Sequence, residues 1–215
     1  QNSNQIMKKT LLMLVTVATA VNVFAQGQIN FNTAVPGQVI ARVYGPEADP
    51  MMQIQGNTST EQPAGSAVYS SSVLVGGSGY SAQLFVGPAG AADDALVGQT
   101  PIQPFRAVIG GNPASAGFVN TATVVVDGIA DGVSAQVQMR AWDNQGGTIA
   151  TWADVEADPT VLRGWSESFA LTLGGGLQPA ANLVGVTSFN LFAVPEPSTI
   201  ALGVLGIGAL LLFRR

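Results

Sequence analysis

Each of the three tryptophans in the chain has a carboxylate close to it in the sequence. The tryptophans are Trp142, Trp152 and Trp165, and the neighbouring carboxylates are Asp143, Asp154, Glu156 and Glu167. An indole ring stacks on the apolar face of a sugar, and a carboxylate accepts hydrogen bonds from the sugar hydroxyls. The pattern is typical of a carbohydrate-binding site in which the three tryptophans, with Tyr80, are the stacking platforms. The plain alternative is that these rings are ordinary core or rim residues.

The same four carboxylates could also supply the acid pair of a glycosidase. That reaction needs two carboxyl groups that face one cleft from opposite sides of the scissile bond. Acidic residues occur throughout the middle of the chain, so an acid beside a tryptophan is weak support for catalysis. We therefore expect no catalytic residue and predict a protein that is not an enzyme.

A calcium site is a weaker candidate at two places. Asp154, Glu156 and Asp158 stand at alternate positions, as oxygen ligands of Ca²⁺ often do. The segment lacks the central glycine and the closing glutamate of an EF-hand. Asp127 and Asp131 each precede a glycine, and the plain reading there is a hairpin turn. The expectation is a protein without a metal or other cofactor.

The composition excludes several kinds of chemistry. The chain has no cysteine and no histidine, which rules out a thiol nucleophile, a Ser-His-Asp triad and a histidine-bound zinc. Between residues 26 and 193 the charged residues are four arginines and twelve acids, which gives a net charge of −8. Nucleic-acid binding requires clustered lysine or arginine, so no nucleic-acid partner is expected.

The elements that must position the candidate residues are predicted to be short β-strands. Segments rich in valine, threonine and aromatic residues alternate with glycine, proline, asparagine and aspartate, which is typical of an all-β fold. We expect a β-sandwich or jelly-roll-like domain. The predicted strands are 28–32, 39–44, 67–75, 81–86, 105–109, 119–126, 135–142, 168–173 and 186–192.

Strict alternation is clearest at residues 135–142. One face carries Ala135, Val137, Met139 and Ala141, and the other carries Gln136, Gln138, Arg140 and Trp142. The small apolar face should enter the core, which leaves Trp142 on the polar face or at the rim. A single helical turn is predicted within residues 151–162, where Pro159 would end it.

The N-terminal segment has the pattern of a signal peptide. Met7 is followed by two lysines, and residues 11–21 form an apolar stretch of the usual length. Residues 23–25 are a small-x-small cleavage site, so we expect cleavage between Ala25 and Gln26.

The C-terminal segment has three consecutive features. Pro195, Glu196 and Pro197 come first, and the uncharged residues 198–213 follow them. As a helix this run would span ~24 Å, against a hydrocarbon core of ~30 Å, so it could cross with local thinning of the bilayer. The basic pair Arg214 and Arg215 then favours a cytoplasmic side for that end. The plain alternative is a buried core helix of a globular domain.

This arrangement resembles the C-terminal signal of PEP-CTERM proteins, a family of exported bacterial proteins. The resemblance covers residues 194–215 and implies recognition by an exosortase, a membrane-embedded cysteine protease thought to cut at or near the Pro-Glu-Pro. Residues 83–90 and 137–143 also resemble Verrucomicrobia-type members of the family, more loosely. That second likeness implies no known activity.

Three parts are predicted: a leader over residues 1–25 with a signal peptide from Met7, a β domain over 26–193, and a sorting signal with a single transmembrane helix over 194–215. The leading hypothesis is an exported, non-enzymatic cell-envelope or extracellular-matrix protein, and the alternative is an extracellular carbohydrate-binding module. The expected partners are an exosortase-type protease, the membrane through the C-terminal helix and, in the alternative, an extracellular polysaccharide. The protein would be anchored in the inner membrane before processing and then reside in the cell envelope or outside the cell.

Overall fold

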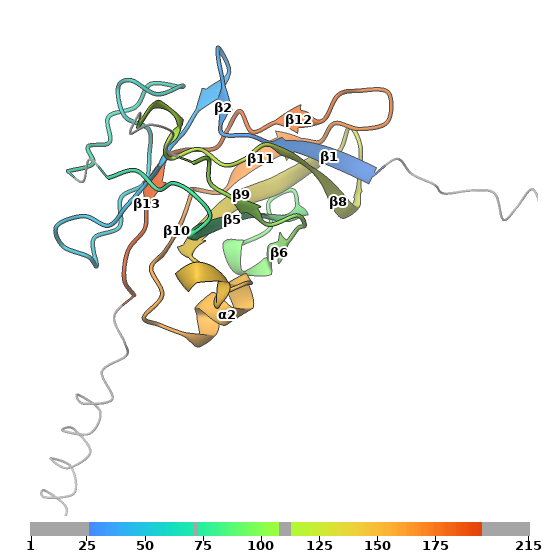
Figure 1. Cartoon of the computed structure of the whole chain (residues 1–215). Helices are drawn as coiled ribbons and strands as arrows, with labels where there is room; N and C mark the ends of the chain where they lie inside the picture. The colour runs from blue at the N-terminus through green and yellow to red at the C-terminus, as the bar shows by residue number, and fades with distance from the viewer. Residues whose placement is uncertain (1–25, 71–72, 108–112, 195–215) are drawn as a thin grey trace, which may run out of the picture.

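The computed structural model describes residues 26–70, 73–107 and 113–194 (Figure 1). These residues form a mostly β structure with several antiparallel sheets, which confirms the all-β prediction. The strands are β1 (Gln26–Phe31), β2 (Ala34–Val35), β3 (Val39–Ile40), β4 (Val43–Tyr44), β5 (Tyr80–Pro88), β6 (Val97–Gly98), β7 (Gln103–Pro104), β8 (Ala122–Ala130), β9 (Ser134–Asp143), β10 (Arg163–Trp165), β11 (Phe169–Thr172), β12 (Ala181–Asn182) and β13 (Phe189–Asn190). The helices are α2 (Trp152–Ala157) and the 3-10 turns η1 (Asp93–Ala95), η2 (Pro113–Ser115) and η3 (Gln145–Gly147).

Two larger sheets contain the long strands. A six-stranded sheet has the order β10-β9-β5-β6, with β11 also paired to β9 and β7 to β5. Its centre is the antiparallel β5–β9 pair, which runs in unbroken register from Tyr80 opposite Asp143 to Pro88 opposite Ala135. A three-stranded sheet has the order β12-β1-β8.

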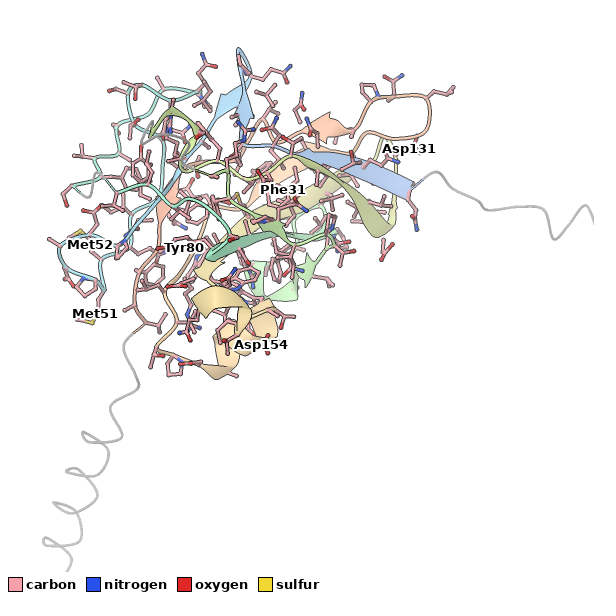
Figure 2. The ribbon with its side chains drawn as sticks, in the orientation of Figure 1. Phe31, Met51, Met52, Tyr80, Asp131 and Asp154 are labelled. Carbon is pink, nitrogen blue, oxygen red and sulfur yellow. The ribbon has the colours of Figure 1, made fainter. Side chains whose placement is uncertain are left out.

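The main core contains residues from both sheets. On β9 the small apolar face, which includes Val137 and Met139, is buried as the alternation predicts. Phe31 of β1, which is labelled in Figure 2, belongs to the same cluster as Val124 of β8. Both side chains are fully buried. Removing a side chain such as Phe31 from water stabilises the fold by roughly 1.5–3 kcal/mol.

Two short parallel pairs join the beginning of the described chain to its end. β1 pairs with β12, and β4 pairs with β13. Arg163 forms a further bridge with Phe192, and the backbone N–H of Ala193 donates to the carbonyl of Pro50. The folded unit is therefore closed by contacts that span most of its length.

The predicted strand over residues 67–75 is wrong. This segment is a loop apart from a single bridge between Leu74 and Tyr44, and residues 71–72 lie outside the described residues. Over residues 67–70 the backbone bonds to side chains and loops instead. Ser70 N–H donates to the Glu47 carboxylate, and Ala67 N–H donates to the Asn57 carbonyl. Of the strand predicted at 105–109, residues 108–109 lie outside the described residues, and the described part forms only the isolated bridge between Phe105 and Val119. The strand predicted at 186–192 is reduced to the two residues of β13 and an isolated bridge at Phe192.

The predicted hairpin at Asp127–Gly132 is also wrong. β8 pairs with β1 and β9 pairs with β5, so the turn between β8 and β9 carries the chain from one sheet to the other. Gly132 adopts a positive φ of 72° in this turn, a conformation that glycine reaches without strain.

The predicted helical turn is confirmed as α2. The Thr151 hydroxyl accepts from Asp154 N–H, and the Asp154 carboxylate accepts in return from Thr151 N–H, which forms a capping box. The helix ends at Ala157, two residues before Pro159.

In the part of the chain that the structure describes, no helix has the length and apolar character needed to cross a membrane. The predicted signal peptide over residues 1–25 and the predicted transmembrane segment over 198–213 both lie outside the described residues.

Candidate functional site

The six-stranded sheet carries a second apolar cluster on the face opposite the main core. In Figure 1, α2 lies below β5 and β6 on this side of the molecule. The buried members of the cluster are Phe85, Leu96, Trp142, Ile149, Trp152, Val155 and Val161. These residues exclude solvent from part of the second face of the sheet. The alternation of apolar and polar residues in β9 would instead predict a face exposed to water.

Trp142 is fully buried inside this second cluster, with an exposed fraction of 0%. Its indole N–H donates to the carbonyl of Ile149 at 3.0 Å. The prediction that Trp142 lies at the rim as a stacking platform is therefore wrong. The physical reason is that α2 and the loop before it cover this end of β9, which the alternation of a single strand does not reveal.

A cleft opens beside the second cluster, between η1 and α2. It has two adjoining lobes of about 400 and 450 Å³. The residues that line both lobes are Asp94, Arg140, Trp152 and Glu156. Asp93, Gln138 and Trp165 complete the first lobe, and Phe85, Leu96 and Thr151 are among the residues that complete the second.

Arg140 is half-buried and occupies the centre of the cleft. Its guanidinium carbon lies 3.9 Å from the centroid of the Phe85 ring and 5.2 Å from that of Trp152. Burial lowers the pKa of Arg140, while the charges of Glu156 and Asp93 act in the opposite direction. An arginine remains charged under such conditions, so the cleft holds a fixed cation.

A buried glutamine fixes the orientation of this arginine. Gln138 is 1% exposed, and its carbonyl oxygen accepts from Arg140 Nε at 2.8 Å. The Gln138 amide donates to Asp93 Oδ2 at 3.0 Å and to the Ser166 carbonyl at 3.2 Å. Arg140 also donates to the Asp93 carbonyl at 2.7 Å. The side chains at the base of the cleft are thus held in place before any ligand arrives.

Four aromatic rings form a chain of edge-to-face contacts whose two middle members, Trp152 and Trp165, line the cleft. Trp152 lies 5.9 Å from Trp142 and 6.4 Å from Trp165, and Trp165 lies 5.0 Å from Phe192, measured between ring centroids. Trp152 is 8% exposed, whereas Trp165 is half-buried and has the more accessible ring. Of the three tryptophans predicted as stacking platforms, the structure brings Trp152 and Trp165 together at one cleft.

The predicted calcium ligands after Trp152 bind separate partners. Asp154 accepts from the Thr151 hydroxyl and backbone, which lowers its pKa, and Asp158 accepts from Thr160, which lowers its pKa. Glu156 accepts from the indole N–H of Trp152 at 2.7 Å. Within residues 26–70, 73–107 and 113–194 there is no group of three acidic or other ligating side chains placed to hold a metal, so neither calcium candidate is supported.

Only one of the four predicted acids of a glycosidase pair lines the cleft, namely Glu156. Asp143 instead accepts from Gln145 N–H at 2.9 Å. Tyr80 pairs opposite Asp143 and packs against the main core, so it is not a platform of this cleft. Glu167 is exposed outside both lobes.

Arg140, Asp93 and Asp94 were not predicted as site residues from their types and spacing in the sequence. The alternation of β9 does contain a signal for Arg140, because it puts that residue on the same face as Gln138. Asp93 and Asp94 belong to η1, which follows the turn after β5. Nothing in their local pattern indicates that this turn brings them over Arg140.

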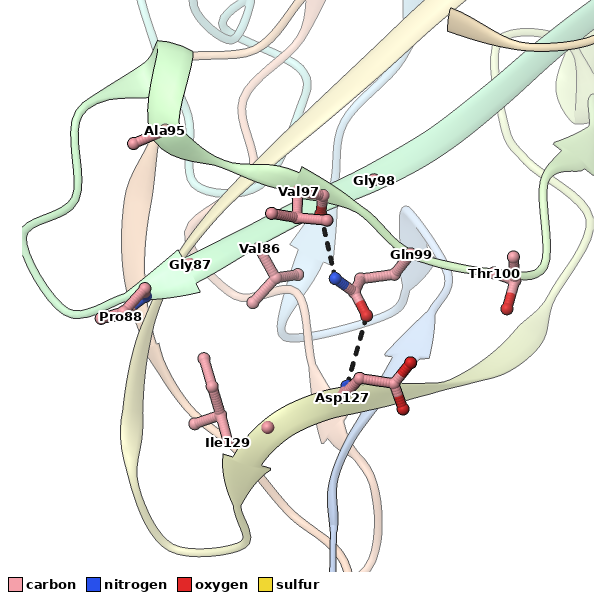
Figure 3. A pocket seen from close by; sticks show the side chains of 11 residues that line it. Val86, Gly87, Pro88, Ala95, Val97, Gly98, Gln99, Thr100, Asp127 and Ile129 are labelled. Carbon is pink, nitrogen blue, oxygen red and sulfur yellow. Dashed lines mark hydrogen bonds between the residues drawn. The ribbon is translucent and has the colours of Figure 1, made fainter.

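A separate pocket of about 330 Å³ lies where β5, β6 and β8 approach one another (Figure 3). Gln99 spans it, since its amide donates to the Val97 carbonyl at 3.0 Å and accepts from Asp127 N–H at 3.3 Å. The pocket has no aromatic ring among its lining residues. Its geometry fits a link between the two sheets better than a ligand site.

The predicted processing residues are mostly outside the described part of the chain. Ala25, Pro195, Glu196, Pro197, Arg214 and Arg215 all lie there. Gln26, the predicted first residue after cleavage, begins β1.

No family model, curated protein or solved structure matches this chain.

Proposed function

We propose that this protein is an exported, non-enzymatic component of the cell envelope, sorted through its C-terminal segment. The support is the sequence pattern at the two ends, together with an apolar core among the described residues that lie between them. Ile29 and Leu191, which lie close to the two predicted targeting segments in the sequence, are both fully buried in this core.

The domain itself is proposed to be a β-sandwich or jelly-roll-like ectodomain. The support is that one apolar core contains side chains of both larger sheets, including Ile29 of β1 and Leu84 of β5. The connection from β8 to β9 passes from one sheet to the other, as connections in sandwiches do. The excess of acids also suits a protein that must stay soluble outside the cytoplasm.

Sorting is tested in the native host with the double variant Pro195→Ala and Glu196→Ala. The tail of the variant should remain uncut, whereas the matched variant Glu167→Gln, an exposed acid within the domain, should be processed like the wild type. The readout is the mass of the envelope-associated protein. Normal processing of the double variant would contradict recognition at Pro195–Pro197.

The basic pair is tested separately because it concerns topology. Replacing Arg214 and Arg215 by glutamate should impair retention of the C-terminal end in the cytoplasm. Protease protection of a C-terminal tag in spheroplasts measures this. Unchanged protection would contradict the proposed orientation.

A second candidate function, carbohydrate binding, is favoured by one specific observation. Trp152 and Trp165 line the same cleft as Arg140 and Glu156, which combines ring surfaces with charged hydrogen-bonding groups. Tryptophan fluorescence of the full chain, titrated with polysaccharides, tests it. The shift should be lost in Trp165→Ala and kept in Val125→Ala, which changes an exposed side chain of β8 in the other sheet. A fluorescence signal that no polysaccharide changes would contradict it.

A further inference from the structure

The rim of the cleft carries more negative than positive charge. Asp93, Asp94 and Glu156 are exposed carboxylates, and Arg140 is the single cation among the residues that line it. The hydrogen bonds of Arg140 go to two neutral oxygens, the side-chain carbonyl of Gln138 and the backbone carbonyl of Asp93. The positive charge is therefore held at the base of the cleft, and the negative charges stand where a ligand enters.

This distribution selects against acidic ligands. A ligand with a carboxylate, sulfate or phosphate group would meet three like charges at the rim before it reached Arg140. The surrounding domain adds to this effect, since residues 26–193 carry a net charge of −8. Long-range repulsion and the local charges thus disfavour the same class of ligand, the anionic one.

The hydrogen-bonding groups of the rim determine which functional groups a ligand of this cleft must carry. Ionised carboxylates accept hydrogen bonds and cannot donate them. Asp93 accepts a hydrogen bond from Gln138 through Oδ2, and Glu156 accepts one from Trp152 through Oε1. One oxygen of each carboxylate therefore holds the side chain in place, and the second oxygen can accept a hydrogen bond from a ligand. A ligand that fits must bring hydroxyl or amine donors to this rim.

The exposed surface of the Trp165 ring and the size of the cleft restrict the class of ligand further. The half-buried Trp165 ring lines the first lobe, whose volume of about 400 Å³ is within the usual range of small-molecule sites. A flat apolar ring beside several acceptors suits a sugar, which has an apolar face and hydroxyl donors around its edge. A flexible basic peptide also offers donors and can contact the ring through a cation–π interaction, but it lacks the rigid apolar face with which a sugar covers an indole.

The geometry points to a site for non-anionic saccharides, that is, neutral sugars or amino sugars, and not for uronic acids or sulfated sugars. This inference rests on the second proposed function and names its ligand class. The ring of one sugar unit lies on Trp165, its hydroxyl or amine groups donate to Asp94 and Glu156, and Arg140 donates to a ring or hydroxyl oxygen.

The test compares ligands of opposite charge on the full chain and one rim variant. The chain is purified in an amine-oxide detergent, which has no sugar head group to compete, and titrated calorimetrically with a neutral glucan oligosaccharide, a chitosan oligosaccharide and an oligogalacturonate. The variant is Asp94→Asn with Glu156→Gln, which keeps the shape of both side chains and leaves an acceptor for Trp152. The control is Asp131→Asn, since Asp131 lies well away from α2 and Asp154 in Figure 2.

The neutral or amino sugar should bind to the wild type, and its affinity should fall about threefold to tenfold in the rim variant, because charge-assisted hydrogen bonds become neutral ones. The Asp131 variant should bind as the wild type does. Binding of the oligogalacturonate equal to or tighter than that of the neutral sugar, strengthened in the rim variant, would overturn the ligand class while leaving carbohydrate binding in place. Binding of an oligolysine peptide without any sugar, or no binding of any oligosaccharide, would overturn both.

Discussion

The guanidinium of Arg140 on β9 lies over the ring of Phe85 on β5, with 3.9 Å between its central carbon and the ring centroid. The two residues are diagonal neighbours, because Arg140 pairs directly with Gln83, two positions before Phe85. A charged side chain is thereby accommodated on the apolar second face of the sheet. Both the stability of this face and the charge pattern of the cleft depend on that contact.

Arg140→Lys should destabilise the domain by about 1–2 kcal/mol. Lysine keeps the charge, but it cannot hold the bonds to Gln138 and Asp93 while it lies flat on an aromatic ring. Denaturant unfolding followed by circular dichroism measures the change. A variant as stable as the wild type would mean that the stacked geometry contributes nothing beyond the charge.

The isolated segment 26–194 should fold and stay soluble without the two terminal segments. Its buried core lies within these residues, and it has no cysteine and a marked excess of acids. The full chain should need detergent, because residues 198–213 are uncharged and mostly apolar. Circular dichroism and analytical sedimentation of both proteins test this. An unfolded segment, or a full chain that is equally soluble as a monomer, would show that the tail belongs to the core.

Two tryptophans of the same cluster should differ sharply in their contribution to stability. Trp142→Ala removes a fully buried ring and should cost about 3–5 kcal/mol, whereas Trp165→Ala removes a half-buried ring and should cost roughly 1–2 kcal/mol. Chemical denaturation of the two variants gives both values. Equal costs would contradict the burial difference that assigns Trp142 to the core and Trp165 to the cleft.

The sequence predicts an element of this structure when the pattern that forms it lies within the element itself, and it fails when the element depends on a distant partner. β5, β8 and β9 are long and rich in apolar residues, so their local sequences predict them, and the alternation of β9 assigns its core face correctly. The two-residue strands β4 and β13 pair across more than a hundred positions, and their local sequences contain no sign of the partner. The same limit applies to the site. Glu156, Trp152 and Trp165 were candidates on residue type, whereas Arg140 and the two acids of η1 become a site only through tertiary contacts.

The capping box of α2 should make the stability of the helix depend on pH. The hydrogen bonds from Thr151 lower the pKa of Asp154, so its carboxylate stabilises the folded state above the ordinary aspartate pKa of about 3.9 and loses this effect as the pH falls below it. The Tm of the wild type should exceed that of Asp154→Asn near neutral pH, and the two values should converge as the pH falls through the lowered pKa of Asp154. A difference that stays constant across this range would contradict the role of the ionised cap.

The link between the two sheets at Gln99 should be sensitive to loss of its amide. Gln99→Leu leaves Asp127 N–H without the Gln99 oxygen that it donates to at 3.3 Å, and the expected cost is about 1–3 kcal/mol. Thr100→Ala, an exposed neighbour in the same pocket, should stay within roughly 0.5 kcal/mol of the wild type. Thermal unfolding compares the two, and equal effects would mean that the Gln99 bridge does not link the sheets.

The mass of the mature protein recovered from the envelope of its native host tests export and C-terminal processing together. We expect a chain that begins at Gln26 and ends at or near Pro195–Pro197, with residues 198–213 removed. A protein that is found in the cytoplasm, starts at Met7 or earlier and still carries Arg214 and Arg215 would show that it is neither exported nor sorted through this segment.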